Sequence, residues 1–343
     1  MTRLPVFLRV SSFSTIAAIV ILIGCAKSHP ARGERPAHPP VQTSPGDLAL
    51  KLNGPFRFVA YGDARFHDPK DATDSNPAVR VALVKAIADA SPAFICFTGD
   101  IVFHGSDRKD WSVFASETTP WREKHISVFP TLGNHELYFL PKPGLTNYFQ
   151  AFPELDKHRY YSVRAGNTLL LALDSTEDEM AGAQAQWLTG KLDSIATDVD
   201  FVFVMTHHPP YTSSSMNLHG EGHSARAAEQ ALAKLLEERQ PRTRARFVVF
   251  SGHVHNYERH EHGGVTYFVS GGAGAHAYPV SRAPSDPYQS NGINYHYLLV
   301  EVDHEKLKIT MNRVEIADGK PAWTQPDSVT ITAPAAAAKA AAQ

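Results

Sequence analysis

Polar side chains follow five separate apolar runs of the sequence, at the point where each run ends. Ligands of open α/β sheets gather at the carboxyl ends of strands, because the loops there converge on one crevice. Glycine begins four of the five polar segments, and it lets the backbone turn sharply beside an ion or a phosphate. The five segments, which we expect to form one site, are Gly62-Asp63, Gly99-Asp100, Gly133-Asn134-His135-Glu136, His207-His208 and Gly252-His253-Val254-His255.

The donor atoms in these segments suit metal ions. Asp and Asn offer hard oxygen ligands, and imidazole adds nitrogen ligands that suit zinc, iron or manganese. A mixed set of six ligands is too large for one four-coordinate ion, but it suits two ions that share a bridging carboxylate. The six candidate ligands are Asp63, Asp100, Asn134, His207, His253 and His255. Two ions about 3.5–4 Å apart form a clamp for displacement at phosphorus and lower the pKa of a bridging water. The sequence therefore predicts two-metal chemistry on a phosphate ester.

Short apolar runs alternate with helical patterns along most of the chain, which predicts a mixed α/β layered domain with an antiparallel portion. We assign it to residues 51–330. A hairpin is expected around Gly166-Asn167. Strands are predicted at 56–61, 93–98, 126–132, 169–173, 201–206, 247–251, 265–270, 295–302 and 307–314. Helices are predicted at 77–90, around Trp111, at 181–195 and at 224–239.

The composition is that of a globular protein, with 43% apolar and 20% charged residues. The net charge is −2 with His neutral, so no basic field indicates a nucleic-acid polymer as partner. Histidine is abundant, with 18 residues, and several lie beside Asp, Asn or Gly. This clustering makes metal chemistry the first hypothesis. Cys96 lies in an apolar run and is predicted to be a buried small hydrophobe.

Residues 1–25 are predicted to be a signal segment outside the fold. The uncharged apolar run Phe13–Gly24 is shorter than the roughly 20 residues that a spanning helix needs. It ends in Leu22-Ile23-Gly24-Cys25, which resembles the bacterial lipobox, whose cysteine is lipidated; the alternative is an ordinary signal peptide or an uncleaved anchor. We therefore expect a lipid-anchored protein of the bacterial cell envelope that faces the periplasm and contacts the membrane only through this lipid. Residues 26–50 are expected to be a Pro-rich flexible tether and residues 331–343 a low-complexity tail.

The polar segments, in this order, resemble the motifs of the calcineurin-like metallophosphoesterases, and especially of their purple-acid-phosphatase-like branch. Val204-Met-Thr-His207 completes the fourth motif, and Asn256-Tyr257-Glu258-Arg259 extends the last one. The resemblance spans residues 56 to 315 approximately. It implies an α/β fold that is a layered α/β/β/α sandwich of mixed sheets.

The resemblance also implies a role for each residue. Asp100 bridges two metal ions, which are Fe, Zn or Mn, and a bridging hydroxide attacks phosphorus. His135 contacts the substrate and helps to protonate or stabilise the leaving oxygen, and the family spacing favours His207 over His208 as a ligand. Glu136 is expected to be a structural partner of nearby backbone. The implied ligands are Asp63, Asp100 and His255 at the first site, and Asp100, Asn134, His207 and His253 at the second.

Two positions depart from the family pattern. Many members have His two residues after the first Asp, where this chain has Arg65, and purple enzymes have a metal-binding Tyr where it has Phe103. The first site is therefore expected to be weak, with water or the neighbouring His104 filling the gap. Arg65 is instead predicted to hold a phosphate oxygen with its planar fork. His219 and His223, in the loop after His207, are further candidates for phosphate contacts.

The expected function is hydrolysis of a small phosphate ester, by a phosphomonoesterase that resembles an acid phosphatase. One alternative is a phosphodiesterase that acts on nucleotides or lipid head groups, and another is a non-catalytic binding lipoprotein. Aromatic residues near the site could stack on an aromatic or nucleoside leaving group. The candidates for this stacking are Tyr138, Phe139, Tyr148 and Tyr211.

Overall fold

A computed structural model of the chain describes residues 41–44, 46–214, 217–218 and 221–335. Two predicted site residues, the lipobox cysteine Cys25 and the phosphate-contact candidate His219, lie outside the described residues. Within the part of the chain that is described, no helix combines the length and the apolar character needed to cross a bilayer.

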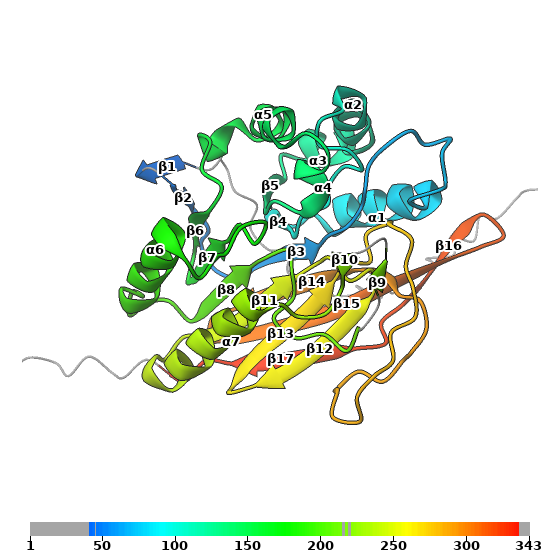
Figure 1. Ribbon diagram of the computed structural model, residues 1–343. Coiled ribbons are helices and arrows are strands. Elements are labelled where there is room, and N and C mark those ends of the chain that lie inside the picture. Colours follow the sequence, from blue (N-terminus) through cyan, green and yellow to red (C-terminus); the bar gives the residue numbers. More distant parts are fainter. Residues whose placement is uncertain (1–40, 45, 215–216, 219–220, 336–343) are drawn as a thin grey trace, which may run out of the picture. The chain divides into compact units, whose positions relative to one another are not determined.

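One sheet has seven strands and carries three neighbouring parallel strands at one side (Figure 1). β3 pairs in parallel with β4, and β4 pairs in parallel with β5. The other strands are antiparallel to their neighbours. In spatial order they are β16 (Lys320–Thr324), β15 (Lys306–Ala317), β14 (Tyr295–Asp303), β3 (Phe56–Tyr61), β4 (Phe94–Phe97) and β5 (Ser127–Pro130), with β17 (Ser328–Thr332) also on β15. The carboxyl ends of β3, β4 and β5 therefore share one edge.

The second sheet has eight strands and is also mixed. β7, β8, β11 and β13 run parallel to one another, whereas β6 and β12 are antiparallel to their neighbours β7 and β13. In spatial order the strands are β1 (Val41–Ser44), β2 (Asp47–Leu50), β6 (Tyr161–Ala165), β7 (Thr168–Ala172), β8 (Phe201–Met205), β11 (Arg246–Ser251), β13 (Val265–Ser270) and β12 (Tyr257–His262). A separate pair of two-residue strands consists of β9 (Asn217–Leu218) and β10 (Glu221–Gly222).

Strict alternation along the strands creates the layers. On β8, Phe203 faces the other sheet, where its ring centroid lies 4.9 Å from that of Phe58, whereas Val204 packs on the opposite side with Leu188 and Leu236. A strand with both faces buried reads as a continuous apolar run. The two sheets therefore share one core, and the helices α6 (Gly182–Asp193) and α7 (Ala227–Arg239) cover the outer face of the second sheet.

The helices begin and end where the sequence provides signals. The amide of Val79 donates to the side chain of Asn76 at 3.2 Å, which caps the first helix, and Ser91 ends it in the left-handed conformation. This helix packs against β14 and β15. The helices are α1 (Pro77–Ala90), α2 (Arg108–Glu117), α3 (Thr119–Glu123), α4 (Asn134–Leu137), α5 (Pro141–Ala151), α6 (Gly182–Asp193) and α7 (Ala227–Arg239), with short 3₁₀ turns at Pro153–Leu155 and Gln240–Arg242.

The predicted layered α/β/β/α sandwich of mixed sheets is confirmed, and each predicted strand is present with ends that differ by a few residues. The hairpin at Gly166 joins β6 to β7. The predicted tether at 26–50 includes residues that belong to the fold, because β1 and β2 lie within it and Leu48 and Leu50 are buried. The predicted tail at 331–343 likewise begins inside the fold, since β17 ends at Thr332. β1, β2 and β17 lack the continuous apolar run that marks the equally short strands β4 and β8, so the sequence did not indicate them.

Candidate metal centre

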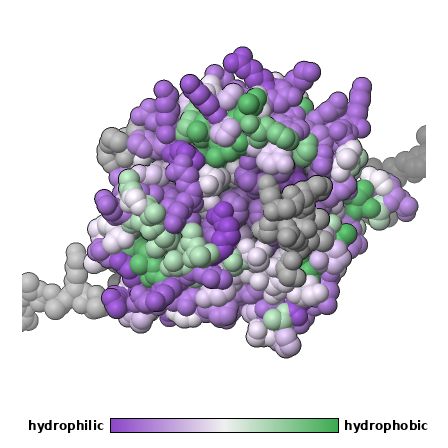
Figure 2. All heavy atoms as spheres, viewed as in Figure 1, coloured by the Kyte–Doolittle hydropathy of each residue, from purple (hydrophilic) through white to green (hydrophobic). Residues whose placement is uncertain are grey.

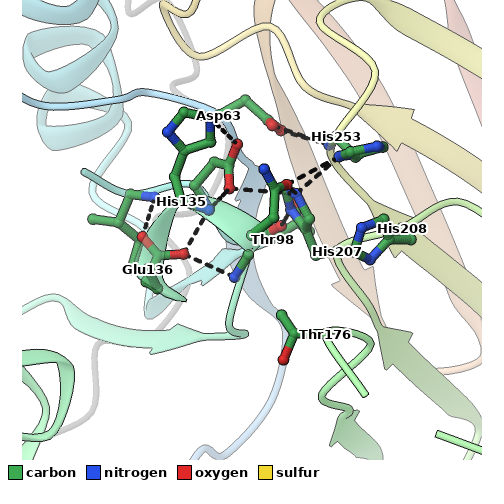
Figure 3. Close-up of polar contacts among 12 residues, drawn as sticks. Asp63, Thr98, His135, Glu136, Thr176, His207, His208 and His253 are labelled. Atoms are coloured by element: carbon green, nitrogen blue, oxygen red, sulfur yellow. Dashed lines mark hydrogen bonds and ion pairs between the residues drawn. The ribbon is translucent and has the colours of Figure 1, made fainter. Parts of the chain in front are cut away.

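The five polar segments meet in space. Figure 3 shows Asp63, His135, Glu136, His207 and His253 close together, and Asp100 contacts His135 and His207. Three of them follow β3, β4 and β5 of one sheet, and two follow β8 and β11 of the other. Hydrogen bonds connect the strand ends. The amide of Asp63 donates to the carbonyl of Gly99 at 3.0 Å, and the amide of His253 donates to the Asp63 carboxylate at 3.0 Å. The second of these bonds links the two sheets directly.

Four ligand atoms form a compact group on one side of this edge. Asn134 Oδ1 lies 2.9 Å from His207 Nε2 and 3.2 Å from His253 Nδ1. The two imidazole nitrogens are 3.3 Å apart, and Asp100 Oδ1 is 3.4 Å from His207 Nε2. Atoms that bind a tetrahedral ion at about 2.1 Å lie about 3.4 Å from one another. Asn134, His207 and His253 therefore present three atoms with the spacing of ligands to one ion, and Asp100 Oδ1 lies beside His207 as a fourth donor.

Backbone carbonyls orient two of the imidazole rings. His207 Nδ1 donates to the carbonyl of Thr98 at 2.8 Å, and His255 Nδ1 donates to the carbonyl of His276 at 3.0 Å. In a neutral ring with the proton on Nδ1, the lone pair lies on Nε2. Both Nε2 atoms point toward the carboxylates, so the chain presents the tautomers that metal ligation requires.

Asp63 and His255 form the second half of the centre. His255 Nε2 lies 3.7 Å from Asp63 Oδ1. Among the described residues this buried nitrogen has no hydrogen-bond partner. Because buried polar atoms in folded proteins are almost always partnered, a buried lone pair that faces a carboxylate is the arrangement expected where a cation binds. The residues present therefore fit the ion that the family pattern implies.

Several of these residues have unfavourable backbone conformations. Asp63, Asp100 and His253 have φ values of 65°, 49° and 67°, in the left-handed region that costs non-glycine residues free energy. Gly99, with φ of 87°, lies so close to the next loop that a Cβ atom there would be 2.8 Å from His207 Nδ1. Strained conformations concentrated at one site are typical of functional centres.

The two buried aspartates differ in their electrostatics. Burial and the neighbouring Asp100 carboxylate raise the pKa of Asp63 well above its ordinary value. Burial also acts to raise the pKa of Asp100, but His135, His207 and Arg65 outweigh it and hold that pKa well below its ordinary value. Asp100 is therefore the carboxylate that stays charged between the two halves of the centre.

The histidines are neutral at physiological pH in this environment. Burial is the largest cause and lowers the pKa of His207, and it lowers those of His253 and His255 further. For His135, burial together with Arg65 lowers the pKa to about 4, although Asp100 acts in the opposite direction. Neutral imidazole is the form that binds a metal ion, so these histidines need not release a proton before they accept cations.

Glu136 joins the loops that follow β4 and β5. Its carboxylate accepts the amides of Gly133, Asp100 and Ile101 at 2.8, 2.9 and 2.8 Å, and the amide of Val102 at 3.3 Å. Burial and the Asp100 charge raise the pKa of Glu136 to about 8, against these amides, which lower it. As predicted, Glu136 is a structural partner of backbone, and it holds Asp100 in place.

His135 lies at the rim of the centre. Its Nδ1 donates to the carbonyl of Phe103 at 2.7 Å, which leaves Nε2 3.9 Å from Asp100 Oδ2. The ring stacks on Tyr138 with centroids 5.5 Å apart. A side chain placed beside the shared carboxylate, and oriented by a carbonyl, can reach a group that is bound there.

The two departures from the family pattern have different surroundings. Arg65 donates from Nη2 to Asp100 Oδ2 at 3.3 Å. The ring of Phe103 packs against His135 and His104 rather than supplying a ligand. His104 does not fill the gap: its Nδ1 lies 3.7 Å from Asp110, and among the described contacts none joins it to Asp63 or His255.

Two hydroxyls that were not among the predicted site residues support the centre. Ser175 Oγ accepts the amides of His207 and His208 at 3.2 and 3.1 Å. Tyr278 accepts the amide of His255 at 3.2 Å and donates to His223 Nδ1 at 2.5 Å. Ser175 could have been found, because Asp174-Ser175 ends an apolar run in the same way as the five segments; Tyr278 lies in a loop without such a signal.

Residues 56–257 match the sequence model of the calcineurin-like phosphoesterase family, which is more than half of the chain. The chain belongs to this family. Its relatives include Purple acid phosphatase 22 of Arabidopsis thaliana, 28% identical over 173 residues, which are 47% of this chain and 37% of that protein. Fe(3+)-Zn(2+) purple acid phosphatase 12 of the same plant is 27% identical over 190 residues, which are 49% of this chain and 37% of that protein. The phosphoesterase therefore spans little more than a third of the curated relatives it matches.

Solved structures agree with this assignment at the level of the fold. The purple acid phosphatase PPD1 of yellow lupin superposes with a TM-score of 0.64 at 16% identity, covering 83% of this chain and 56% of that one. GAP50 of Plasmodium superposes with a TM-score of 0.51 at 12% identity, covering 82% and 90%. Family and relatives indicate a phosphoesterase hydrolase, and the described Asp and His clusters could bind metal ions.

Proposed function

We propose that this phosphoesterase hydrolyses phosphate esters with two metal ions. Asp63 and His255 would hold one ion and Asn134, His207 and His253 the other, with the Asp100 carboxylate shared between them. The observation that carries the proposal is the group around Asn134, His207 and His253, whose ligand atoms lie 2.9–3.3 Å apart with lone pairs facing one another. Fe, Zn and Mn all suit this donor set.

The protein's own residues then have separate tasks. When bound, the ions supply the positive charge that stabilises the transferring phosphoryl group and activate the attacking water. Arg65, with five N–H donors on a planar fork, binds a phosphoryl oxygen. His135 gives the leaving oxygen a hydrogen bond or a proton from Nε2, once the charge of the bound phosphate favours its protonated form.

The rim of the site offers a surface for an aromatic leaving group. Phe139 is 71% exposed beside Tyr138, with ring centroids 4.2 Å apart, and Figure 2 shows apolar side chains gathered over α4 and α5. Two of the four aromatic candidates are wrong for this role. Tyr148 is fully buried and donates to the carbonyl of Pro130. Tyr211 donates to Glu237 on α7.

Chelator-sensitive turnover tests this function. The full-length chain, stripped and reloaded with Zn²⁺ or Mn²⁺, is assayed on p-nitrophenyl phosphate and on bis-p-nitrophenyl phosphate, and we expect faster hydrolysis of the monoester. His207→Ala should lower kcat/KM by at least about 100-fold. His262→Ala, at an exposed histidine of β12, is the control and should leave it unchanged. Two bound metal ions without turnover of either ester would favour the binding lipoprotein instead, and a faster diester would favour the phosphodiesterase.

We also propose that Cys25 carries a lipid that anchors the protein in the bacterial cell envelope, facing the periplasm. The support is the uncharged run Phe13–Gly24 that ends at this cysteine. Labelling of cells with a radioactive fatty acid should mark the wild-type chain but not Cys25→Ser. Equal label in both would exclude lipidation at this cysteine.

A further inference from the structure

The two halves of the proposed centre differ in the number of protein ligands. Around His207 and His253 the chain offers four donor atoms: those of Asn134, His207 and His253 lie within 3.3 Å of one another, and Asp100 Oδ1 lies 3.4 Å from His207 Nε2. Around His255, the chain offers that imidazole, Asp63 and the shared Asp100. Among the described residues, neither Phe103 nor His104 adds a donor there, because one is a hydrocarbon ring and the other faces Asp110.

The two oxygens of Asp100 have different partners. Oδ1 lies 3.4 Å from His207 Nε2 and accepts the amide of His135 at 3.0 Å, which places it on the four-donor side. Oδ2 accepts Arg65 Nη2 at 3.3 Å. The guanidinium therefore occupies the oxygen through which Asp100 would bridge to the ion beside Asp63. A guanidinium is always charged and has no lone pair, so it opposes a cation and cannot bind it.

The backbone holds Arg65 in this place. Its amide donates to the carbonyl of Asp100 at 3.0 Å, and its carbonyl accepts His67 Nδ1 at 2.8 Å. Its φ is 49°, in the left-handed region. The side chain is mostly buried, with 16% exposed. Because hydrogen bonds fix the main chain on both sides of the Arg65 Cα, the side chain can leave Asp100 only by rotating about its own bonds.

We propose that Arg65 makes the metal centre asymmetric, so that the four-donor site holds one cation tightly and the site of Asp63 and His255 binds a second cation weakly. The second cation has to displace the guanidinium from Asp100 Oδ2. This inference rests on the proposed metal-dependent function, and it identifies a residue that sets the relative affinities of the two sites. A charged neighbour or a lost contact of this kind changes metal affinity by about 10–100-fold.

Calorimetric titration of the stripped, full-length chain with Zn²⁺ tests the proposal without any turnover. The wild-type chain should bind one ion tightly and a second at least about tenfold more weakly. Arg65→His, which removes the charge and adds an imidazole, should tighten the second ion by about tenfold or more. Arg65→Gln, which only removes the charge, should tighten it less, and Arg65→Lys should leave it weak. The metal content after gel filtration should rise from one equivalent toward two in Arg65→His.

The outcomes separate this inference from the proposed function. Two equal sites in the wild-type chain, or an unchanged second affinity in both Arg65→His and Arg65→Gln, would overturn the role of Arg65 and leave the dinuclear proposal standing. Absence of any Zn²⁺ binding by a folded wild-type chain would overturn both. Far-ultraviolet circular dichroism of each variant establishes that it is folded, and Arg65→Lys provides a comparison that keeps the charge.

Discussion

Ser175 is the hydroxyl that fixes the backbone of His207, and its removal should weaken both stability and metal binding. Ser175→Ala leaves the amides of His207 and His208, which donate to Oγ at 3.2 and 3.1 Å, without their acceptor in a buried place. Each unsatisfied buried amide costs about 1–3 kcal/mol, so the free energy of unfolding should fall by about 2–6 kcal/mol. Because His207 then loses its support, Zn²⁺ affinity at the four-donor site should fall by about 10–100-fold.

Two measurements on the same preparations check this prediction. Urea unfolding in the presence of chelator gives the change in stability without metal, and calorimetric titration gives the change in Zn²⁺ affinity. Ser112→Ala is the matched control, because that hydroxyl donates to the carbonyl of Arg108 at 2.9 Å on an exposed helix face. If the two variants differ by less than about 0.5 kcal/mol and bind Zn²⁺ equally, the reasoning from unsatisfied amides is refuted.

Two further predictions concern pH and substrate choice. Burial and the neighbouring Glu229 raise the pKa of Glu179 from 4.5 to about 8, so its contribution to stability is fully present below about pH 4.5 and is lost as the pH rises through 8. In Glu179→Gln, the free energy of unfolding measured in urea should fall less between pH 5 and 9, by up to about 5 kcal/mol. Parallel pH curves for the variant and the wild-type chain would contradict this prediction. Phe139→Ala should lower kcat/KM for phenyl phosphate by about 5–10-fold relative to ethyl phosphate, because a stacked ring contributes about 1 kcal/mol. An unchanged ratio would show that this ring does not touch the leaving group.

The strand ends could be predicted because each is an apolar run that stops at a polar residue. Asp63 and His253 lie 190 positions apart in the sequence, and only the shared rule about strand ends brings them to one site. The two hydroxyls behind the site are different. Tyr278 follows no regular run, so its contact with the His255 amide depends on a loop path that local patterns do not encode.

The directions in which individual side chains point could not be predicted from the sequence either. The departure at Arg65 was visible as a missing imidazole, but its contact with Asp100 follows from a left-handed backbone that propensities disfavour for arginine. Tyr211 shows the same limit in reverse. It lies only four positions after His207, yet its hydroxyl reaches Glu237 on α7, because the turn after β8 carries it away from the strand edge.

The bond between the His253 amide and Asp63 joins the two sheets at a single edge. Ions bound there would add further links between the two sheets, beside the hydrogen bonds of His253 with Asp63 and of His207 with Thr98. A ligand present at 100 times its Kd adds about 2.7 kcal/mol to the stability of a folded protein. The supply of metal would then govern how long each molecule survives heat or proteolysis, as well as how fast it works.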